Sequence, residues 1–225
     1  GQPKGVSIEH SNVINYCHNN RYNICSKAVS RDKMKIVSVT NIVFDIFVTE
    51  SLLPLLNGMI IYLADEDEVI SQNKLSKLIM KNKIDVIQTT PTKMKSYMLD
   101  KNLDYLSILK VIVLGGEAFS EELYKEIVNY SKAKVVNIYG PAETTVWSTI
   151  TTICNDDITI GSPIANTQIY ILDKNNELFP IGVPGELCIA GEGVGKGYLY
   201  RHNLTAEKFV PNPFATAENR HGKIM

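Results

Sequence analysis

The 225-residue chain lacks the features that mark membrane-spanning, secreted or nucleic-acid-binding proteins. No run approaches the roughly 20 apolar residues that a helix needs to cross a bilayer, and the opening GQPKGVSIEH is not a signal peptide. The 23 basic and 24 acidic side chains leave a net charge of −1, too small a field to attract nucleic acid or an anionic membrane. These absences favour a cytoplasmic protein that binds neither.

Cysteine and histidine are scarce and scattered. The four cysteines (Cys17, Cys25, Cys154 and Cys188) show no C-x-x-C spacing, and no histidine pairs with a cysteine at ligand spacing. Structural zinc sites need such clusters, so we expect the cysteines to be ordinary core or surface residues.

Between residues 35 and 140, short apolar runs alternate with helix-like segments. The apolar runs are 35–40, 58–64, 85–90, 109–116 and 134–140, and the helix-like segments are 48–56, 73–83, 91–99 and 120–132. Ser120 precedes two glutamates, as an N-cap does. This alternation predicts an α/β fold with a largely parallel sheet flanked by helices.

After about residue 155 the pattern changes to strands and turns, with five glycines in VPGELCIAGEGVGKGYL. We therefore predict two parts: an α/β core at 1–155 and a smaller, β-rich, barrel-like subdomain at 156–225. The chain also lacks an initiator Met and stops at GKIM, where an apolar run begins, which favours a segment of a longer protein.

Three distinctive stretches follow predicted strands: QTTP, LGGEA and NIYGPAE. Ligands in parallel sheets collect beyond the carboxyl ends of strands. The glycines of LGGEA permit close approach of a flat ligand, although a tight strand-to-helix turn explains them equally well. GQPKG at positions 1–5 suits an anion through backbone N–H groups and Lys4, or is simply an exposed turn.

Two acidic residues stand out. In NIYGPAETTVW, Glu143 offers an oxygen ligand suited to Mg²⁺, or else caps a helix. In FDIF, Asp45 lies among apolar residues and is expensive to bury unless a cation meets it; its alternative is also a helix cap.

Together these stretches resemble the adenylation domains of nonribosomal peptide synthetases. GQPKG resembles the end of their phosphate loop, FDIF and NIYGPAE resemble two further elements, and GELCIAGEGVGKGYLYRHNLTAEKF resembles a fourth, in the family's order and spacing. The resemblance covers essentially the whole chain. It implies the large N-terminal part of an adenylate-forming enzyme, without the first half of the phosphate loop, the ribose-binding aspartate or the C-terminal lid subdomain, so the fragment alone is expected to be inactive.

The resemblance implies that the parent protein activates an amino acid with ATP and Mg²⁺ as an aminoacyl-adenylate, with release of pyrophosphate. The acyl group then passes to the phosphopantetheine thiol of a peptidyl carrier domain, next to a condensation domain of the same synthetase. An acyl- or aryl-CoA ligase and a non-catalytic nucleotide-binding or interaction module are the alternatives.

By the same resemblance, Glu143 holds Mg²⁺ at the phosphates. The family often has threonine at position 142, whose hydroxyl meets the α-phosphate; Ala142 has none, so Thr144 or Thr145 is expected to contribute more. The implied nucleotide-binding residues are Lys4, Gly115, Gly116, Glu117, Asn137, Tyr139, Gly140 and Ala142, with Tyr139 stacked on adenine.

The resemblance also implies a side-chain pocket in which Asp45 pairs with the substrate ammonium. Its positions are Asp45, Ile46, Thr49, Gln88, Val113, Gly115, Ile138, Val146 and Trp147. Bulky Ile46, Ile138 and Trp147 and the long Gln88 leave little room, and the pattern resembles the family's glycine-selecting one. We predict glycine, then alanine, then a small polar amino acid.

Overall fold

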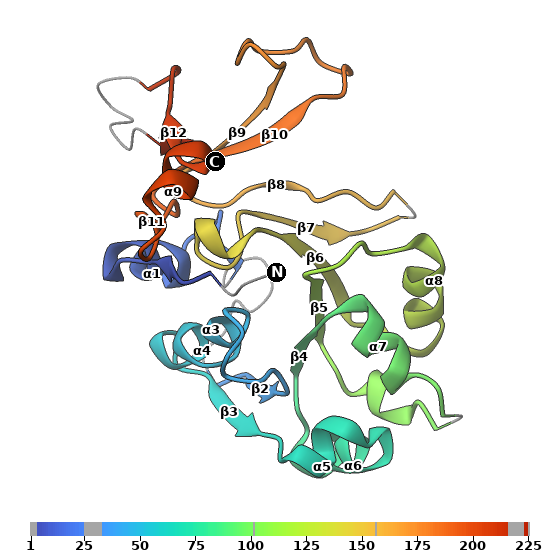
Figure 1. Ribbon diagram of the computed structural model, residues 1–225. Helices are drawn as coiled ribbons and strands as arrows, with labels where there is room; N and C mark the ends of the chain where they lie inside the picture. The colour runs from blue at the N-terminus through green and yellow to red at the C-terminus, as the bar shows by residue number, and fades with distance from the viewer. Residues whose placement is uncertain (1–3, 25–32, 101, 156, 216–222, 225) are drawn as a thin grey trace. The chain divides into compact units, whose positions relative to one another are not determined.

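The computed structural model describes residues 4–24, 33–100, 102–155, 157–215 and 223–224 (Figure 1). Gly1 to Pro3, which begin the predicted phosphate-loop fragment, and Cys25 lie outside the described residues. The chain divides into two compact units. The smaller comprises residues 1–16, 140–148 and 163–225, and the larger 17–139 and 149–162. Both are discontinuous in sequence, and the predicted boundary after residue 155 stays a prediction.

The larger unit is built on a mixed sheet. Its order is β3-β2-β4-β5-β6-β7-β8, parallel from β3 to β6 and antiparallel between β6 and β7. The strands are β2 (Lys35–Ser38), β3 (Ile60–Leu63), β4 (Val86–Thr89), β5 (Val111–Gly115), β6 (Lys134–Tyr139), β7 (Thr149–Ile153) and β8 (Ser162–Pro163). The predicted largely parallel sheet is confirmed.

The helices of this unit connect successive strands. They are α3 (Phe47–Glu50), α4 (Leu52–Leu56), α5 (Glu66–Ile70), α6 (Gln72–Asn82), α7 (Pro91–Tyr97), the 3₁₀ helix η1 (Asp104–Ser107) and α8 (Glu121–Tyr130). The predicted cap of α8 is confirmed, because the Ser120 hydroxyl accepts the Leu123 N–H at 3.3 Å. The predicted helix 48–56 is wrong as one element, since it breaks at Ser51. Pro54 has no N–H for the carbonyl four residues earlier, and its ring crowds that carbonyl.

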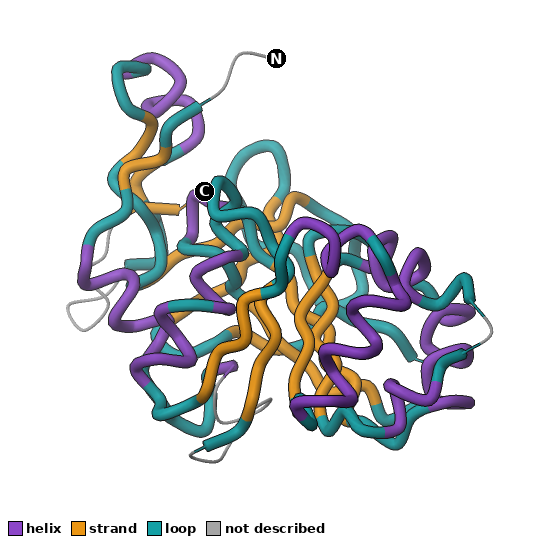
Figure 2. The backbone as a smooth tube through the Cα atoms, turned by 90° about the horizontal axis from the view of Figure 1, so that it is seen from below, coloured by secondary structure: helices purple, strands orange, loops and turns teal. Residues whose placement is uncertain are grey.

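The main core lies on one face of this sheet. In Figure 1, α6, α7 and α8 lie on one side of the strands and α3 and α4 on the other, and Figure 2 shows the strands as a layer with helices on either side. Buried residues of α6 to α8, including Leu75, Met94 and Ile127, pack with Ile87 and Ile112 of the strands. Successive strand residues point to opposite faces, so the next residue along each strand points to the opposite face of the sheet.

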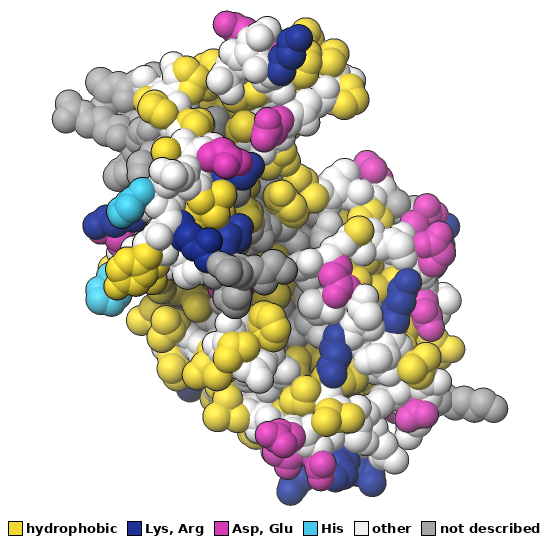
Figure 3. Space-filling view, in the orientation of Figure 1, with side chains coloured by type: hydrophobic (Ala, Val, Ile, Leu, Met, Phe, Trp, Pro, Cys, Tyr) yellow, Lys and Arg dark blue, Asp and Glu magenta, His cyan; other side chains and the backbone are white. Residues whose placement is uncertain are grey.

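The outer surface around α4 is apolar. Leu55 and Leu56 of α4 and Leu63 of β3 are each more than 60% exposed. Figure 3 shows hydrophobic side chains gathered over the region where Figure 1 draws α3, α4 and β3. No helix in the described ranges has the length and apolar character that crossing a bilayer requires.

The smaller unit is β-rich. Its antiparallel sheet has the order β12-β13-β10-β9, and a separate pair joins β1 to β11. Its elements are β1 (Val6–Ser7), most of α1 (His10–Cys17), η2 (Ala142–Thr144), β9 (Thr167–Leu172), β10 (Glu186–Gly191), β11 (Gly197–Tyr198), α9 (His202–Lys208), β12 (Val210–Pro211) and β13 (Lys223–Ile224). The described strands form an open sheet, so its barrel-like character stays a prediction.

Candidate functional site

Residues predicted to line a pocket lie on one face of the larger unit's sheet. Gln88 on β4 is opposite Val113 on β5, and Gly115 is opposite Ile138 on β6. The intervening strand residues belong to the helix-covered core. Gln88, Val113 and Ile138 are at most 2% exposed. The fold therefore brings these side chains, which are distant in sequence, to one face.

The start of α3 covers this face. The Gln88 side-chain amide donates to the Ile46 carbonyl at 3.4 Å and to Oε1 of Glu50 at 3.1 Å. Thr49, between them in sequence, is buried. The structure thus places α3, with its predicted pocket residues, against Gln88.

Glu50 is a residue that the sequence analysis missed. Its side chain is fully buried, and its carboxylate accepts hydrogen bonds from the Ser38 hydroxyl, the Val39 and Thr40 N–H groups, the Thr40 hydroxyl and the Gln88 amide. Burial raises the pKa of Glu50, while these hydrogen bonds act in the opposite direction. The sequence feature that could have identified Glu50 is its position as a carboxylate at the end of the largely apolar stretch FDIFVTE.

A cavity of about 520 Å³ opens beside this network, at the carboxyl ends of β2 and β3. Ser38, Val39 and Thr40, which donate to Glu50, form one wall, and Phe47 and Leu63 lie among the other lining residues. None of the predicted pocket or nucleotide-binding residues lines this cavity, so it is separate from the site that the sequence predicts.

The burial expected for Asp45 is wrong. Its side chain is exposed, as are those of Val43 and Phe44, which are 78% and 61% exposed. Residues 42–46 form turns ahead of α3, which turns these apolar neighbours outward. Asp45 is not the N-cap of α3 either, because Ile46 occupies that position without a side-chain cap. Its pairing with an ammonium group stays a prediction.

The LGGEA stretch forms a turn at the end of β5. Gly116 has φ +82, a left-handed conformation that favours glycine. The Glu117 carboxylate accepts the N–H of Thr92 at 3.0 Å, in the first turn of α7, and this bonding lowers the pKa of Glu117. Part of the turn thus serves local structure, and its contact with a nucleotide stays a prediction.

Asn137 and Tyr139 end β6 in different surroundings. The buried Asn137 donates from Nδ2 to the Thr159 carbonyl at 2.8 Å, tying β6 to the segment after β7. Tyr139 is 39% exposed and offers an accessible ring. Exposure suits the predicted stacking of Tyr139, whereas the Asn137 amide already has a structural partner.

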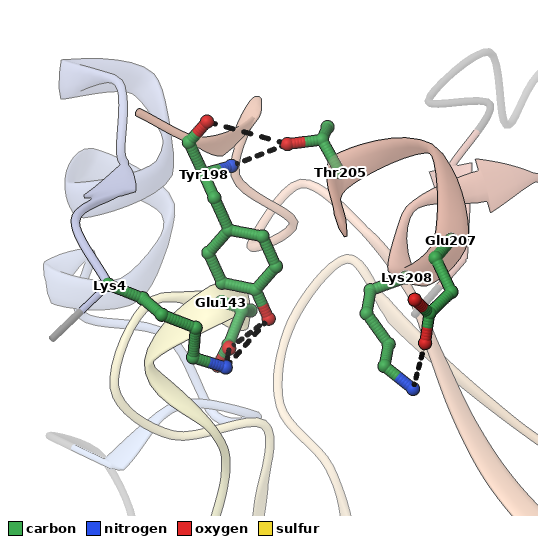
Figure 4. Close-up of polar contacts among 6 residues, drawn as sticks. All are labelled: Lys4, Glu143, Tyr198, Thr205, Glu207 and Lys208. Atoms are coloured by element: carbon green, nitrogen blue, oxygen red, sulfur yellow. Dashed lines mark hydrogen bonds and ion pairs between the residues drawn. The ribbon is translucent and has the colours of Figure 1, made fainter. Parts of the chain in front are cut away.

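In the smaller unit, Lys4, Tyr198 and Glu143 form a chain of polar contacts (Figure 4). Lys4 Nζ donates to the Tyr198 hydroxyl at 3.3 Å, and that hydroxyl donates to Oε1 of Glu143 at 2.5 Å. Lys4 Nζ also lies 3.6 Å from the same carboxylate oxygen. The hydrogen bond with Tyr198 raises the pKa of Lys4, and burial, aided by Glu143, raises the pKa of Tyr198. Tyr198 was not predicted, although it lies in the quoted GKGYLY segment.

Glu143 has the chemistry expected of a magnesium ligand. In the described part of the chain, no three His, Cys, Asp or Glu side chains group closely enough to hold a metal ion. Mg²⁺ is commonly bound through one or two carboxylates, water and substrate phosphates rather than by an all-protein cage. A single carboxylate with a cationic neighbour therefore fits an ion that arrives with a polyphosphate.

The turn after Glu143 is strained. Thr145 and Val146 have φ +62 and +70, which is uncommon for residues other than glycine and rarer still for β-branched side chains. The Trp147 N–H donates to the Thr145 carbonyl at 2.9 Å, closing a tight γ-turn. A Cβ on Gly140 would lie 2.5 Å from Cα of Trp147, so only glycine fits there. This packing buries Trp147 to 1% exposure.

The two threonine hydroxyls in this turn have internal partners. Thr144 Oγ1 lies 2.6 Å from the Ser148 hydroxyl, and Thr145 Oγ1 donates to the Gly193 carbonyl at 2.7 Å. Both residues are buried, whereas Ala142 is exposed. A phosphate contact by Thr144 stays a prediction and would require exchange of its present hydrogen bond.

The predicted residues thus divide between the two units. The larger holds Asp45, Ile46, Thr49, Gln88, Val113, Gly115, Gly116, Glu117, Asn137, Ile138 and Tyr139, and the smaller holds Lys4, Gly140, Ala142, Glu143, Thr144, Val146 and Trp147. Their union in one nucleotide site and one pocket stays a prediction.

Comparison with known proteins yields a family match. The model of the family described as AMP-binding enzyme matches residues 1–199. Bacitracin synthase 1 of Bacillus licheniformis is 39% identical over 97% of this chain, and surfactin synthase subunit 1 of Bacillus subtilis is 34% identical over 98%. The chain spans only 4% and 6% of the lengths of these two relatives.

Solved structures share the fold. A four-domain nonribosomal peptide synthetase, holo-AB3403, solved with AMP and glycine, is 31% identical with a TM-score of 0.85, over 100% of this chain and 16% of its own. The NpsA N-terminal subdomain of Klebsiella oxytoca also has a TM-score of 0.85, at 21% identity, over 100% of this chain and 55% of its own, which shows the fold alone.

Proposed function

This chain belongs to the AMP-binding enzyme family, and we propose that it is part of an adenylation domain in a nonribosomal peptide synthetase. The complete domain activates an amino acid with ATP as an aminoacyl-adenylate and releases pyrophosphate. It then loads the acyl group onto the phosphopantetheine of a carrier domain, beside a condensation domain, in the cytoplasm. The observation that carries this proposal is the gathering of Gln88, Val113, Gly115 and Ile138 on one sheet face, where Gln88 is hydrogen-bonded to Ile46 and to Glu50 of α3.

Glycine is the proposed substrate, with alanine second. The pocket positions carry bulky or long side chains, and selection for glycine rests on filled volume, since the added methyl of alanine or a longer side chain is excluded sterically where the space is already occupied. The similar synthetase solved with AMP and glycine supports this choice, because it is 31% identical over the whole chain. Trp147 is proposed to close the pocket, and its burial is consistent with a fixed wall.

In the proposed mechanism, the substrate carboxylate attacks the α-phosphorus of ATP in line with the departing pyrophosphate. The protein mainly orients the reactants and neutralises charge. Asp45 pairs with the substrate ammonium and Tyr139 stacks on adenine, while Lys4 interacts with the phosphates. Glu143 would hold Mg²⁺, which supplies charge neutralisation at the phosphates.

An acyl- or aryl-CoA ligase is the second candidate function, because Asp45 is exposed. An exposed carboxylate has no burial cost, so its presence does not by itself exclude substrates that lack an ammonium group.

Pyrophosphate exchange on the complete synthetase tests these proposals. Amino acids, benzoates and fatty acids are compared, with Glu143→Gln as the inactive control. We expect the strongest exchange with glycine and a glycyl mass increase on the phosphopantetheine-bearing carrier domain. Stronger exchange with leucine or phenylalanine would contradict the substrate, and exchange with aryl or fatty acids alone would contradict amino-acid activation.

A further inference from the structure

The side-chain amide of Gln88 is held in one orientation. Its nitrogen donates to the Ile46 carbonyl and to the Glu50 carboxylate, so both amide hydrogens have acceptors. Rotating the amide by half a turn would set its oxygen against those two acceptors. These two acceptors therefore direct Nε2 of Gln88 toward Ile46 and Glu50 and its Oε1 away from them.

The orientation depends on Glu50. An ionised carboxylate only accepts hydrogen bonds, and Glu50 is held in place by Ser38, Val39 and Thr40 at the end of β2. These donors leave the carboxylate no freedom to turn away. Glu50 thus acts as a rigid acceptor that dictates which end of the Gln88 amide faces it.

The consequence is an unpaired acceptor. Gln88 Oε1 is buried and has no hydrogen-bond partner among the described residues. Buried polar atoms without a partner are rare and costly, and they call for a donor from water or a ligand. The neighbouring pocket residues Val113, Gly115 and Ile138 have no side-chain donor. A glycine substrate has one donor group, its ammonium, which carries three N–H bonds.

We propose that Glu50 is a positioning residue that holds Gln88 so that its buried, unpartnered Oε1 accepts a hydrogen bond from the ammonium group of the substrate amino acid. This inference rests on the proposed function and deepens it, because it gives the ammonium a second acceptor besides Asp45. Gln88 then contributes to binding as well as to filled volume.

Steady-state pyrophosphate exchange on the complete synthetase, with KM for glycine and for ATP measured separately, tests the inference. Gln88→Met removes the acceptor at similar length, and we expect KM for glycine to rise about tenfold to a hundredfold, as for a lost hydrogen bond to a charged group. The KM for ATP stays unchanged. Glu50→Gln replaces an acceptor of the Gln88 amide by a group that carries NH₂, so the Gln88 side chain loses its fixed orientation and KM for glycine rises similarly.

A conservative variant separates positioning from mere structural support. In Glu50→Asp the side chain remains a carboxylate that only accepts hydrogen bonds, so KM for glycine should rise less than in Glu50→Gln. The matched control is Ser131→Ala, which removes a buried hydroxyl that donates to the Leu106 carbonyl at 2.7 Å. It leaves KM for glycine unchanged, although thermal stability falls.

Two results would overturn the inference. One is an unchanged KM for glycine in Gln88→Met and Glu50→Gln, and the other is a KM for glycine that rises as much in Glu50→Asp as in Glu50→Gln. Failure of the proposed function looks different, because the wild-type protein would then show no exchange with any amino acid, which would overturn both proposals.

Discussion

The hydroxyl of Tyr198 donates a hydrogen bond to Oε1 of Glu143 across 55 residues of sequence. A carboxylate held in this way has a restricted orientation, and Lys4 lies beside it. The residue proposed to hold Mg²⁺ is therefore supported by a tyrosine from β11.

Tyr198→Phe should weaken the use of Mg²⁺ in the complete synthetase. Partners that orient a metal ligand commonly contribute tenfold or more to metal affinity, so we expect the Mg²⁺ concentration for half-maximal exchange to rise about tenfold. The control is Tyr170→Phe in β9, because the Tyr170 ring stacks on Phe214 and, among the described residues, makes no hydrogen bond to Glu143. If Tyr198→Phe and Tyr170→Phe share one Mg²⁺ dependence, the supporting role is disproved.

Gly140→Ala should destabilise the fold. The added Cβ would lie 2.5 Å from Cα of Trp147 and 2.6 Å from the nitrogen of Ser148, so backbone must move. We expect the free energy of unfolding, measured with urea, to fall by about 1–3 kcal/mol or more. Gly182→Ala is the control, because its added Cβ would have no atom within 4 Å and only its positive φ is unfavourable. We expect it to lower the free energy of unfolding by about 1–2 kcal/mol. A smaller loss for Gly140→Ala than for Gly182→Ala would refute the steric argument.

Trp147→Ala should broaden the substrate range if Trp147 closes the pocket. Removing this buried ring is expected to admit larger amino acids in the exchange assay, while lowering stability by about 3–5 kcal/mol. Trp147→Phe, a milder change, guards against loss of folding and should admit only slightly larger substrates. An unchanged substrate profile in both folded variants would show that Trp147 does not limit side-chain size.

Glu50 should make stability depend on pH. Burial raises the pKa of Glu50 above its ordinary 4.5, so the folded state holds the proton more tightly than the unfolded state does. The contribution of Glu50 to the stability of the folded state is therefore complete below pH 4.5 and is lost as the pH rises through its raised pKa. The free energy of unfolding of wild type minus that of Glu50→Gln should therefore fall from acidic to neutral pH.

Urea unfolding across this pH range checks the sign for Glu50. Glu126→Gln, at an exposed position on α8, serves as the control and should show a much flatter difference. A wild-type advantage that grows with pH would mean that the hydrogen bonds to Glu50 outweigh its burial.

Local sequence patterns were sufficient for most of the sheet and for α8. Apolar runs bounded by turn residues predicted β4, β5 and β6, and Ser120 with the acidic residues after it predicted the start of α8. Helix α5 was missed because it buries no residue and so carries no apolar pattern, although Asp65 and Glu68 form a capping box. The break at Ser51 shows that a proline outweighed an otherwise helical pattern.

Asp45 shows how sequence neighbours mislead about burial. Its neighbours Phe44, Ile46 and Phe47 suggested an apolar environment. The turn before α3 instead exposes Asp45 and Phe44, while Ile46 and Phe47 are half-buried. The buried acid in this segment is Glu50, since the first helical turn of α3 directs it toward β2 and β4.

The sequence by itself determined the parallel sheet, because apolar runs alternate with helix-like segments, and its family resemblance implied the pocket positions. Only the tertiary structure decided which charges are buried and what meets them. Glu50 finds donors on β2 and β4, and Tyr198 reaches Lys4 across 194 residues of sequence. Such contacts form between segments that are far apart in the sequence, and local sequence periodicity does not show which distant segments meet.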